Sequence, residues 1–309
     1  MSVTVEKWDG KKITKPGIYD MPMSVYHSDC CDGPSVSSTG LRTFVLKSPL
    51  HFWDTSYLNP DRDPDDPDEI EKEHFRIGRA AHWLMFEKAA FDAHIAVRPT
   101  TWDSWRSKDA KEWRLDAMRE GFTVMTPDEM DRVHGVVRSL TRHPLYQQGL
   151  LGGAIETSII SKDEKTGIWL KSRPDSVPIA EAFTDLKVVA DAKPEVFERS
   201  IRDLGYDLQM ALAGICHEKV TGKTIDQFWL VAVESRRPFP VHVASISTAA
   251  VYWARIKLRT ALDRMAECLK TGEWPAFDED GRAYTPPKAV LERLETEQRA
   301  HLWAQDDDF

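Results

Sequence analysis

The sequence predicts an α/β fold in which helices flank a central mixed β-sheet. Two stretches in which apolar and polar residues alternate, at residues 154–162 and 167–177, surround a polar turn and indicate a β-hairpin. A further strand pattern at residues 183–190 is followed by a helical pattern at residues 206–220. This interleaving of strands with helices is typical of α/β domains.

Patterns in the rest of the chain complete this architecture. An amphipathic stretch covers residues 39–52, and Ser48-Pro49 indicates a break within it. The tetrapeptide that begins at Thr126 has the sequence of a capping box, which predicts a helix from there to about residue 141. Before it, a helical pattern begins at about Glu73. After it, the patterns predict strands at 225–235 and 241–247 and a long amphipathic helix at 248–270.

Two aspartates and a lysine in the central strands carry the clearest chemical signal. Side chains in a strand repeat every two residues, so Asp185 and Lys187 project from the same face of strand 183–190. Asp175 lies at the end of the preceding hairpin, and adjacent strands would bring it close to Asp185. Two carboxylates can share a hard divalent cation, and a nearby ammonium can orient water or stabilise charge on a phosphate. These residues are the minimum set for metal-dependent hydrolysis of a phosphodiester.

The order of the surrounding residues decides between two interpretations of this signal. An isolated Asp-x-Lys on a strand is most often a solvated cross-strand ion pair. Here a hairpin supplies the first aspartate, the next strand supplies Asp185-Leu186-Lys187, and the following helix carries Tyr206 and Gln209 three residues apart on one face. Taken together, these features favour a functional site.

This order resembles the PD-(D/E)XK nuclease superfamily, with Pro174-Asp175 as the first motif and Asp185-Leu186-Lys187 as the second. Over most of its length, the chain is more specifically similar to the RecE-type exonucleases (exonuclease VIII) of phages and prophages. The segments that resemble this family are 17–20, 25–29, 36–41, 48–53, 75–87, 156–158 and Tyr206-x-x-Gln209. The resemblance therefore implies a restriction-endonuclease-like core with a central mixed sheet.

The resemblance implies a metal site that takes Mg²⁺, with Mn²⁺ able to substitute. Its ligands would be His82, Asp175, Asp185 and the carbonyl group of Leu186. A lone histidine on an apolar helix face is more often a core residue than a ligand, and the resemblance reverses this preference for His82. Glu156 could bind a second metal ion, although a glutamate on a surface strand explains it nearly as well.

The remaining site residues would act on the water and the phosphate. Lys187 would orient or deprotonate the attacking water, or stabilise the transition state, and the sequence leaves these roles open. Gln209 would position the water or Lys187, and Tyr206 would contact a phosphate. We expect further DNA contacts from cations near the site, namely Arg79, Arg106, Lys108, Lys111 and Arg173.

By resemblance, the expected activity is that of an exodeoxyribonuclease on linear double-stranded DNA. It would act in the 5′→3′ direction and leave 3′ single strands for a recombinase of the annealing type. An oligomeric ring around DNA is expected by analogy. Two alternatives remain: a helicase-associated or CRISPR-adaptation nuclease of the same fold, and a non-catalytic module that binds DNA ends.

Length and composition set limits on these expectations. The 309 residues are 41% apolar and contain no run long enough to span a membrane and no signal-peptide pattern, so we expect a protein of the bacterial cytoplasm, encoded by a phage or prophage. The net charge of −9 is unusual for a DNA-binding protein, but much of the acid lies in residues 61–73 and 306–308. We expect an N-terminal segment at 1–72 with a flexible acidic loop at about 59–72, a nuclease core at 73–275 and a tail at 276–309.

Residues 98–119 combine tryptophans with cations and allow two interpretations. Aromatic and basic side chains together can stack bases and hold phosphates, as in single-strand binding proteins. The interspersed acidic residues support the other interpretation, a solvated helix that buries Trp102, Trp105 and Trp113 in the core, and the sequence leaves both open.

The cysteines do not form a pattern for metal or disulfide chemistry. Cys30, Cys31, Cys216 and Cys268 match no zinc spacing, and the single late cysteine argues against an iron–sulfur cluster. We expect four reduced structural thiols.

Overall fold

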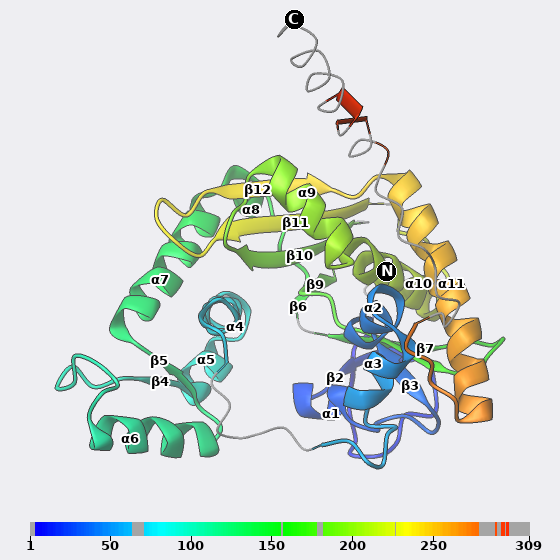
Figure 1. Ribbon diagram of the computed structural model, residues 1–309, viewed down its shortest axis with the longest axis horizontal. Helices are drawn as coiled ribbons and strands as arrows, with labels where there is room; N and C mark the ends of the chain where they lie inside the picture. The colour runs from blue at the N-terminus through cyan, green and yellow to red at the C-terminus, as the bar shows by residue number, and fades with distance from the viewer. Residues whose placement is uncertain are drawn as a thin grey trace, which may run out of the picture. The chain divides into compact units, whose positions relative to one another are not determined.

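The computed structural model describes residues 4–63, 71–155, 157–177, 182–225 and 227–277, and five positions beyond them (Figure 1). Residues Met1–Ala276 form one compact unit and Phe277–Phe309 form a second. In the second unit, Lys288 forms an ion pair with Glu292 one helical turn further on. Most of the acidic loop expected at residues 59–72 lies outside the described residues, which end at 63 and resume at 71.

A five-stranded mixed sheet carries the central strand β10 (Ala182–Val189). β10 pairs in parallel with β11 (Gln227–Glu234) and antiparallel with β9 (Ser176–Val177), and β12 (Val241–Ser245) and β6 (Ala154–Ile155) form the edges. The prediction of an α/β fold with a mixed sheet flanked by helices is confirmed.

A second five-stranded sheet differs from the expected single hairpin. Its order is β1 (Glu6–Lys7), β2 (Gly17–Asp20), β7 (Ser158–Lys162), β8 (Trp169–Ser172) and β3 (Ser35–Ser37). The hairpin arms predicted at 154–162 and 167–177 each contribute one strand to this sheet and one to the sheet of β10. N-terminal strands cover both edges of the β7–β8 pair, and this pairing is not visible in local periodicity. A separate parallel pair joins β4 (Ile95–Val97) to β5 (Thr123–Met125).

Local sequence signals set the helix starts. Thr126 and Glu129 form the predicted capping box of α7 (Pro127–Arg142), and Ser48 caps α3 (Pro49–Thr55) after the predicted break. The other helices are α1 (Met23–His27), α2 (Ser38–Leu46), α4 (Glu73–Phe86), α5 (Lys88–His94), α6 (Lys108–Arg119), α8 (Pro144–Gln147), α9 (Pro194–Asp203), α10 (Tyr206–Thr221) and α11 (Thr248–Thr271). No described helix is both long and apolar enough to cross a membrane.

The two faces of the central sheet are buried against different helices. On one face, Phe183 of β10 joins a core cluster with residues of α10 and α11. On the other, Leu186 joins a cluster with residues of α4 and α7. Because strand side chains alternate, Asp185 and Lys187 belong to the face of Phe183, toward α10, while Leu186 faces α4. Both helices that could contribute to a site thus flank the same strand (Figure 1).

Candidate active site

Asp175 is held against the Asp-x-Lys strand by a backbone hydrogen bond. The turn before β9 places Asp175 beside β10, where Ser176 pairs with Thr184. The amide of Leu186 donates to Asp175 Oδ2 at 2.6 Å. The sequence prediction that adjacent strands bring Asp175 and Asp185 together therefore agrees with the register of this strand pair.

His82 reaches Asp175 from α4. His82 Nε2 lies 2.9 Å from Asp175 Oδ1. α4 packs on β10 at Gly78, where a Cβ would lie at an ordinary contact distance of 3.7 Å from Cβ of Val188. α4 thus brings the imidazole to Asp175, beside the strand that carries Asp185.

Asp185, Lys187 and Gln209 form a closed polar network. Lys187 Nζ forms an ion pair with Asp185 Oδ2 and donates to Gln209 Oε1 at 3.2 Å. The amide nitrogen of Gln209 donates to Asp185 Oδ1 at 2.9 Å. The first turn of α10 therefore holds the carboxylate and the ammonium in one fixed arrangement.

Tyr206 is placed by the turn that starts α10. Gly205 has φ of 66°, in the left-handed region, and a Cβ there would meet Leu46 Cδ1 at 2.9 Å, so the position requires glycine. Lys187 Nζ lies 4.7 Å from the centre of the Tyr206 ring, and the guanidinium carbon of Arg42 lies 5.8 Å from it. Arg42 Nη1 also donates to the carbonyl group of Leu204 at 3.2 Å. The tyrosine ring thus contacts Lys187 and an arginine from α2.

Burial and like charge shift the titration of the two carboxyl groups in opposite directions. Burial raises the pKa of Asp185 to about 6, and the Asp175 carboxylate adds to this rise, against the opposing effects of Lys187 and His82. For Asp175, burial acts to raise the pKa, but His82, Lys187 and the Leu186 amide outweigh it and the pKa is lowered. Burial acts to lower the pKa of Lys187, and the carboxylates of Asp185 and Asp175 outweigh it, so the pKa is raised and the ammonium form is favoured.

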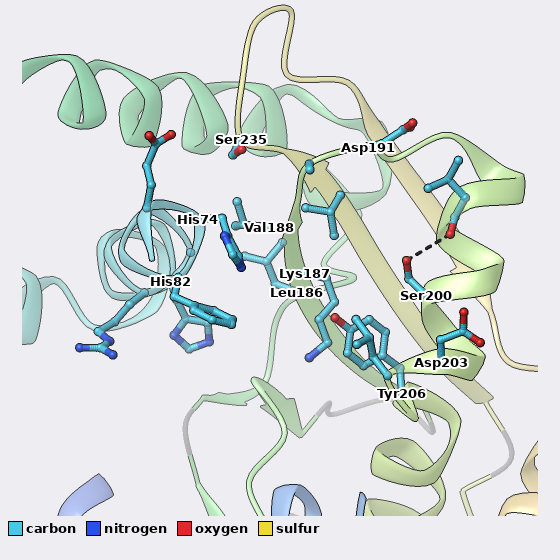
Figure 2. A pocket seen from close by; sticks show the side chains of 18 of the residues that line it. His74, His82, Leu186, Lys187, Val188, Asp191, Ser200, Asp203, Tyr206 and Ser235 are labelled. Carbon is cyan, nitrogen blue, oxygen red and sulfur yellow. Dashed lines mark hydrogen bonds between the residues drawn. The ribbon is translucent and has the colours of Figure 1, made fainter. Parts of the chain in front are cut away.

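His82, Leu186, Lys187 and Tyr206 line part of a cavity of about 1340 Å³ (Figure 2). Lys187 and Tyr206 project into it from β10 and the start of α10, and His82 projects from α4. The cationic lining residues outnumber the acidic ones: Arg42, Lys47, Arg79, Arg132, Lys187 and Arg236 against Glu73, Asp191 and Asp203. A cavity with this lining attracts anions even though the chain is acidic overall.

The other expected site residues lie in different places. Arg79 lines the cavity and pairs with Glu71 at 2.6 Å. Arg173 instead binds the carbonyl group of Met21 at 2.8 Å, within the contacts of the second sheet. Arg106, Lys108 and Lys111 are exposed around α6 and are not among the residues that line the cavity, and Glu156 lies outside the described residues.

The tryptophans of the 98–119 segment pack on one another. The rings of Trp105 and Trp113 stack at 6.2 Å, and Trp102 contacts Trp113 edge to face at 6.0 Å. The guanidinium groups of Arg98 and Arg114 lie 5.3 Å and 4.8 Å from the Trp105 ring centre. All three tryptophans are half-buried, so their rings are neither wholly in the core nor freely exposed for bases.

Sequence reasoning missed Arg42 and the pair of arginines around Glu73. Glu73 forms ion pairs with Arg132 and, at 3.4 Å, with Arg236, which come from α7 and the β11–β12 loop. These contacts join residues far apart in the chain. The local signal for Arg42 was weak, because it is one polar residue of the amphipathic stretch 39–52.

The residues of this site fit a hard divalent cation. Asp175 and Asp185 are both largely buried, and each ionised carboxylate makes ionisation of the other less favourable, a repulsion that a cation would relieve. His82 adds a nitrogen donor that suits Mn²⁺ better than Mg²⁺. Within the described ranges, no three His, Cys, Asp or Glu side chains are already gathered to hold an ion; His82 pairs with Asp175, and Asp185 pairs with Lys187.

The fold and the arrangement of these residues define a nuclease fold of the PD-(D/E)XK type. The chain belongs to the family described as PDDEXK-like domain of unknown function (DUF3799), whose family model matches residues 56–281. The chain matches no curated protein sequence.

Two solved structures are similar to the chain. The first, provisionally designated an exonuclease, is from Eubacterium rectale: it is 14% identical, with a TM-score of 0.57, over 87% of this chain and 93% of that one. The second is an alkaline exonuclease from Laribacter hongkongensis, 13% identical over 60% of this chain and 97% of that one, with a TM-score of only 0.24. The likeness to the first supports the same fold.

We predict that Asp185→Asn stabilises the metal-free protein in a pH-dependent way. The pKa of Asp185 is raised from 3.8 to about 6, so this group's contribution to stability is complete below the lower value and is lost as the pH rises through the higher one. Relative to wild type, the neutral variant should therefore gain little near pH 4 and more near pH 7.5, up to the order of 3 kcal/mol. Chemical denaturation in EDTA at both pH values measures this.

The matched control is Asp191→Asn, which removes an exposed carboxylate from the same cavity. Its effect on the free energy of unfolding should be similar at the two pH values. A stabilisation by Asp185→Asn that is equal at both, or larger at the lower pH, would contradict the assigned electrostatics.

Proposed function

We propose that the protein is a Mg²⁺-dependent exodeoxyribonuclease that degrades linear double-stranded DNA. The observation that carries this proposal is the set of Asp175, Asp185 and Lys187, joined by Gln209 beside a cavity lined by cations. A fold that served only as a scaffold would have no chemical need for two buried carboxylates beside a buried ammonium. This argument disfavours a non-catalytic module that binds DNA ends.

Asp175, Asp185, His82 and the Leu186 carbonyl group would hold the Mg²⁺ ion, for which Mn²⁺ can substitute. When bound, such an ion activates water and neutralises charge that builds on the scissile phosphate. The Asp175 carboxylate is oriented for this role by the Leu186 amide, and Gln209 orients the carboxylate of Asp185.

Lys187 would act as a cation rather than as a base. Its raised pKa keeps the ammonium protonated, a state that can donate hydrogen bonds to water or to a phosphate oxygen but cannot accept a proton. Gln209 and the Tyr206 ring restrict where the ammonium lies. Tyr206 and Arg42 at the side of the cavity would contact a phosphate of the bound strand.

We further propose that the enzyme resects DNA for recombination. It would degrade one strand in the 5′→3′ direction from a duplex end and leave a 3′ single strand for an annealing recombinase. The resemblance to RecE-type exonucleases supports this proposal, and it supports a ring-shaped homo-oligomer around the DNA. A helicase-associated or CRISPR-adaptation nuclease remains the alternative of the same fold.

Metal removal and loss of Lys187 should stop hydrolysis in different ways. Linear duplex DNA should be degraded with Mg²⁺ or Mn²⁺ and left intact in EDTA. Lys187→Ala should bind DNA as wild type does but lose at least about a hundredfold in rate, the scale for removal of one charge-stabilising group. Asp175→Ala and Asp185→Ala should lose at least as much. Rates come from release of labelled nucleotides and affinities from fluorescence anisotropy.

Two results would count against these roles. Full activity in EDTA would contradict the two-carboxylate metal site. Near-normal cleavage by Lys187→Ala together with weaker DNA binding would make this residue a phosphate anchor instead.

The enzyme should require a DNA end. Covalently closed circular duplex should survive conditions under which the same DNA, once linearised, is degraded, because a closed circle offers no strand end to enter the site. With the label at either end of separate substrates, the 5′ label should be released first. Rapid nicking of closed circles would indicate an endonuclease, and early release of the 3′ label would reverse the polarity.

A further inference from the structure

A second cavity, of about 610 Å³, lies between α7 and the loop that joins β11 to β12. It is separate from the residues that form the polar network around Asp185. Its lining includes His134, Arg138 and Arg142 from α7 and Arg237 from the loop, and its acidic lining residue is Asp131. The cavity is therefore strongly basic in a chain whose net charge is −9.

The three arginines of this cavity differ from the arginines that pair with a neighbouring acid. Several arginines elsewhere are neutralised by a neighbouring acid, as in the pairs Arg76–Glu129, Arg132–Glu73, Arg255–Glu218 and Arg259–Asp163. Arg138, Arg142 and Arg237 are exposed and form no ion pair with an acidic residue in the described part of the chain. Exposed charges usually belong to a solvated helix face. That explanation does not account for three arginines that line the same cavity.

The two elements that carry these arginines, α7 and the β11–β12 loop, are packed and hydrogen-bonded to each other. A Cβ at Gly135 would lie 2.3 Å from Cε2 of Phe239, so the absence of a side chain lets the loop's ring press directly on α7. Ser139 Oγ donates to the carbonyl group of Phe239 at 2.6 Å, and Arg132 Nε donates to that of Ser235 at 2.9 Å. The ring contact and these two hydrogen bonds hold the loop that carries Arg237 against α7.

The spacing on α7 suits a repeating anion. His134, Arg138 and Arg142 follow one another at intervals of four residues, which places them on one side of the helix about 6 Å apart. Arginine is the side chain best suited to phosphate, because its planar guanidinium can donate two parallel hydrogen bonds. A row of such groups matches a phosphodiester backbone better than a single small anion.

The second cavity continues the path of the first along the sheet. Ala232 of β11 pairs with Lys187, and Ser235 follows three residues later, about 10 Å along an extended strand. Ser235 and Arg236 line the active-site cavity, whereas the next residue, Arg237, lines the second one. A duplex advances about 3.4 Å per base pair, so phosphates within one turn of the cleaved end can reach these arginines.

We propose that this second cavity binds the phosphate backbone of the DNA duplex next to the end being degraded. This inference rests on the proposed function and adds a substrate-positioning site outside the catalytic network. Arg138, Arg142 and Arg237 hold the backbone without reading its sequence, and they keep the duplex aligned with the active-site cavity while nucleotides are removed. The binding energy comes from release of the counterions condensed on the phosphates.

The test compares two triple variants that remove the same charge. In the first, Arg138, Arg142 and Arg237 are changed to Gln. In the control, the exposed cations Lys223, Lys257 and Arg264, which line neither cavity, are changed to Gln. Binding of the full-length protein to a labelled blunt duplex is measured in EDTA across a series of salt concentrations, and thermal melting verifies that each variant folds.

The expected result is specific to the first variant. Its affinity should fall about tenfold or more at moderate salt, and the slope of log affinity against log salt should become shallower by about two to three, close to one per lost phosphate contact. The control should keep the wild-type slope. With Mg²⁺, the first variant should show a higher KM for long duplex with a largely unchanged kcat.

Other outcomes separate this inference from the proposed function. If the first variant binds duplex with the wild-type affinity and slope while wild type degrades DNA, the second cavity has no role in DNA binding and the proposed function stands. If wild type neither binds nor degrades DNA, both proposals fail together. Equal losses in both triple variants would show that only overall charge matters and would overturn the assignment of the cavity.

Discussion

The hydrogen bond from the Leu186 amide to Asp175 ties two buried carboxylates to one strand, and the rest of the site compensates for the repulsion that results. Burial raises the pKa of Asp185, and the neighbouring Asp175 carboxylate adds to this rise. His82 from α4 and Lys187 from β10 supply the partly compensating positive charge, and Gln209 from α10 fixes the lysine and Asp185 together. Helices on both faces of the sheet therefore contribute side chains that bind Asp175 and Asp185.

An acidic protein that acts on a polyanion must separate its charges in space. Around the active-site cavity, Glu73 lies between Arg132 and Arg236 and neutralises part of their charge. The arginines of the second cavity lack such a partner among the described residues. Partly compensated cations close to the chemistry would permit release of product, while uncompensated ones further along would retain the duplex. On this account, the overall charge of −9 limits binding elsewhere on the surface without preventing it here.

Local periodicity was sufficient to predict the strands of the central sheet and the relation of Asp185 to Lys187, but not the strands β1 to β5. A period of two determines which side chains share a face, and a spacing of three at the start of α10 places Tyr206 and Gln209 together. The capping box at Thr126 was equally visible because it depends on four consecutive residues.

What local sequence did not reveal depends on contacts between distant segments. The division of the hairpin between two sheets follows from pairing with N-terminal strands, which local alternation does not encode. Arg42 joins the site through Leu204 and Tyr206, more than 160 residues away. Arg173 was expected at the DNA, but tertiary packing places its side chain on the carbonyl group of Met21.

A crystal soaked in Mn²⁺ and measured at wavelengths where manganese scatters anomalously tests the central claim most directly. The account predicts an anomalous peak in contact with carboxylate oxygens of both Asp175 and Asp185, with Lys187 beside it and no peak in crystals of Asp185→Asn. A peak elsewhere, or one that persists unchanged in Asp185→Asn, would contradict the assignment of these two aspartates as the metal site.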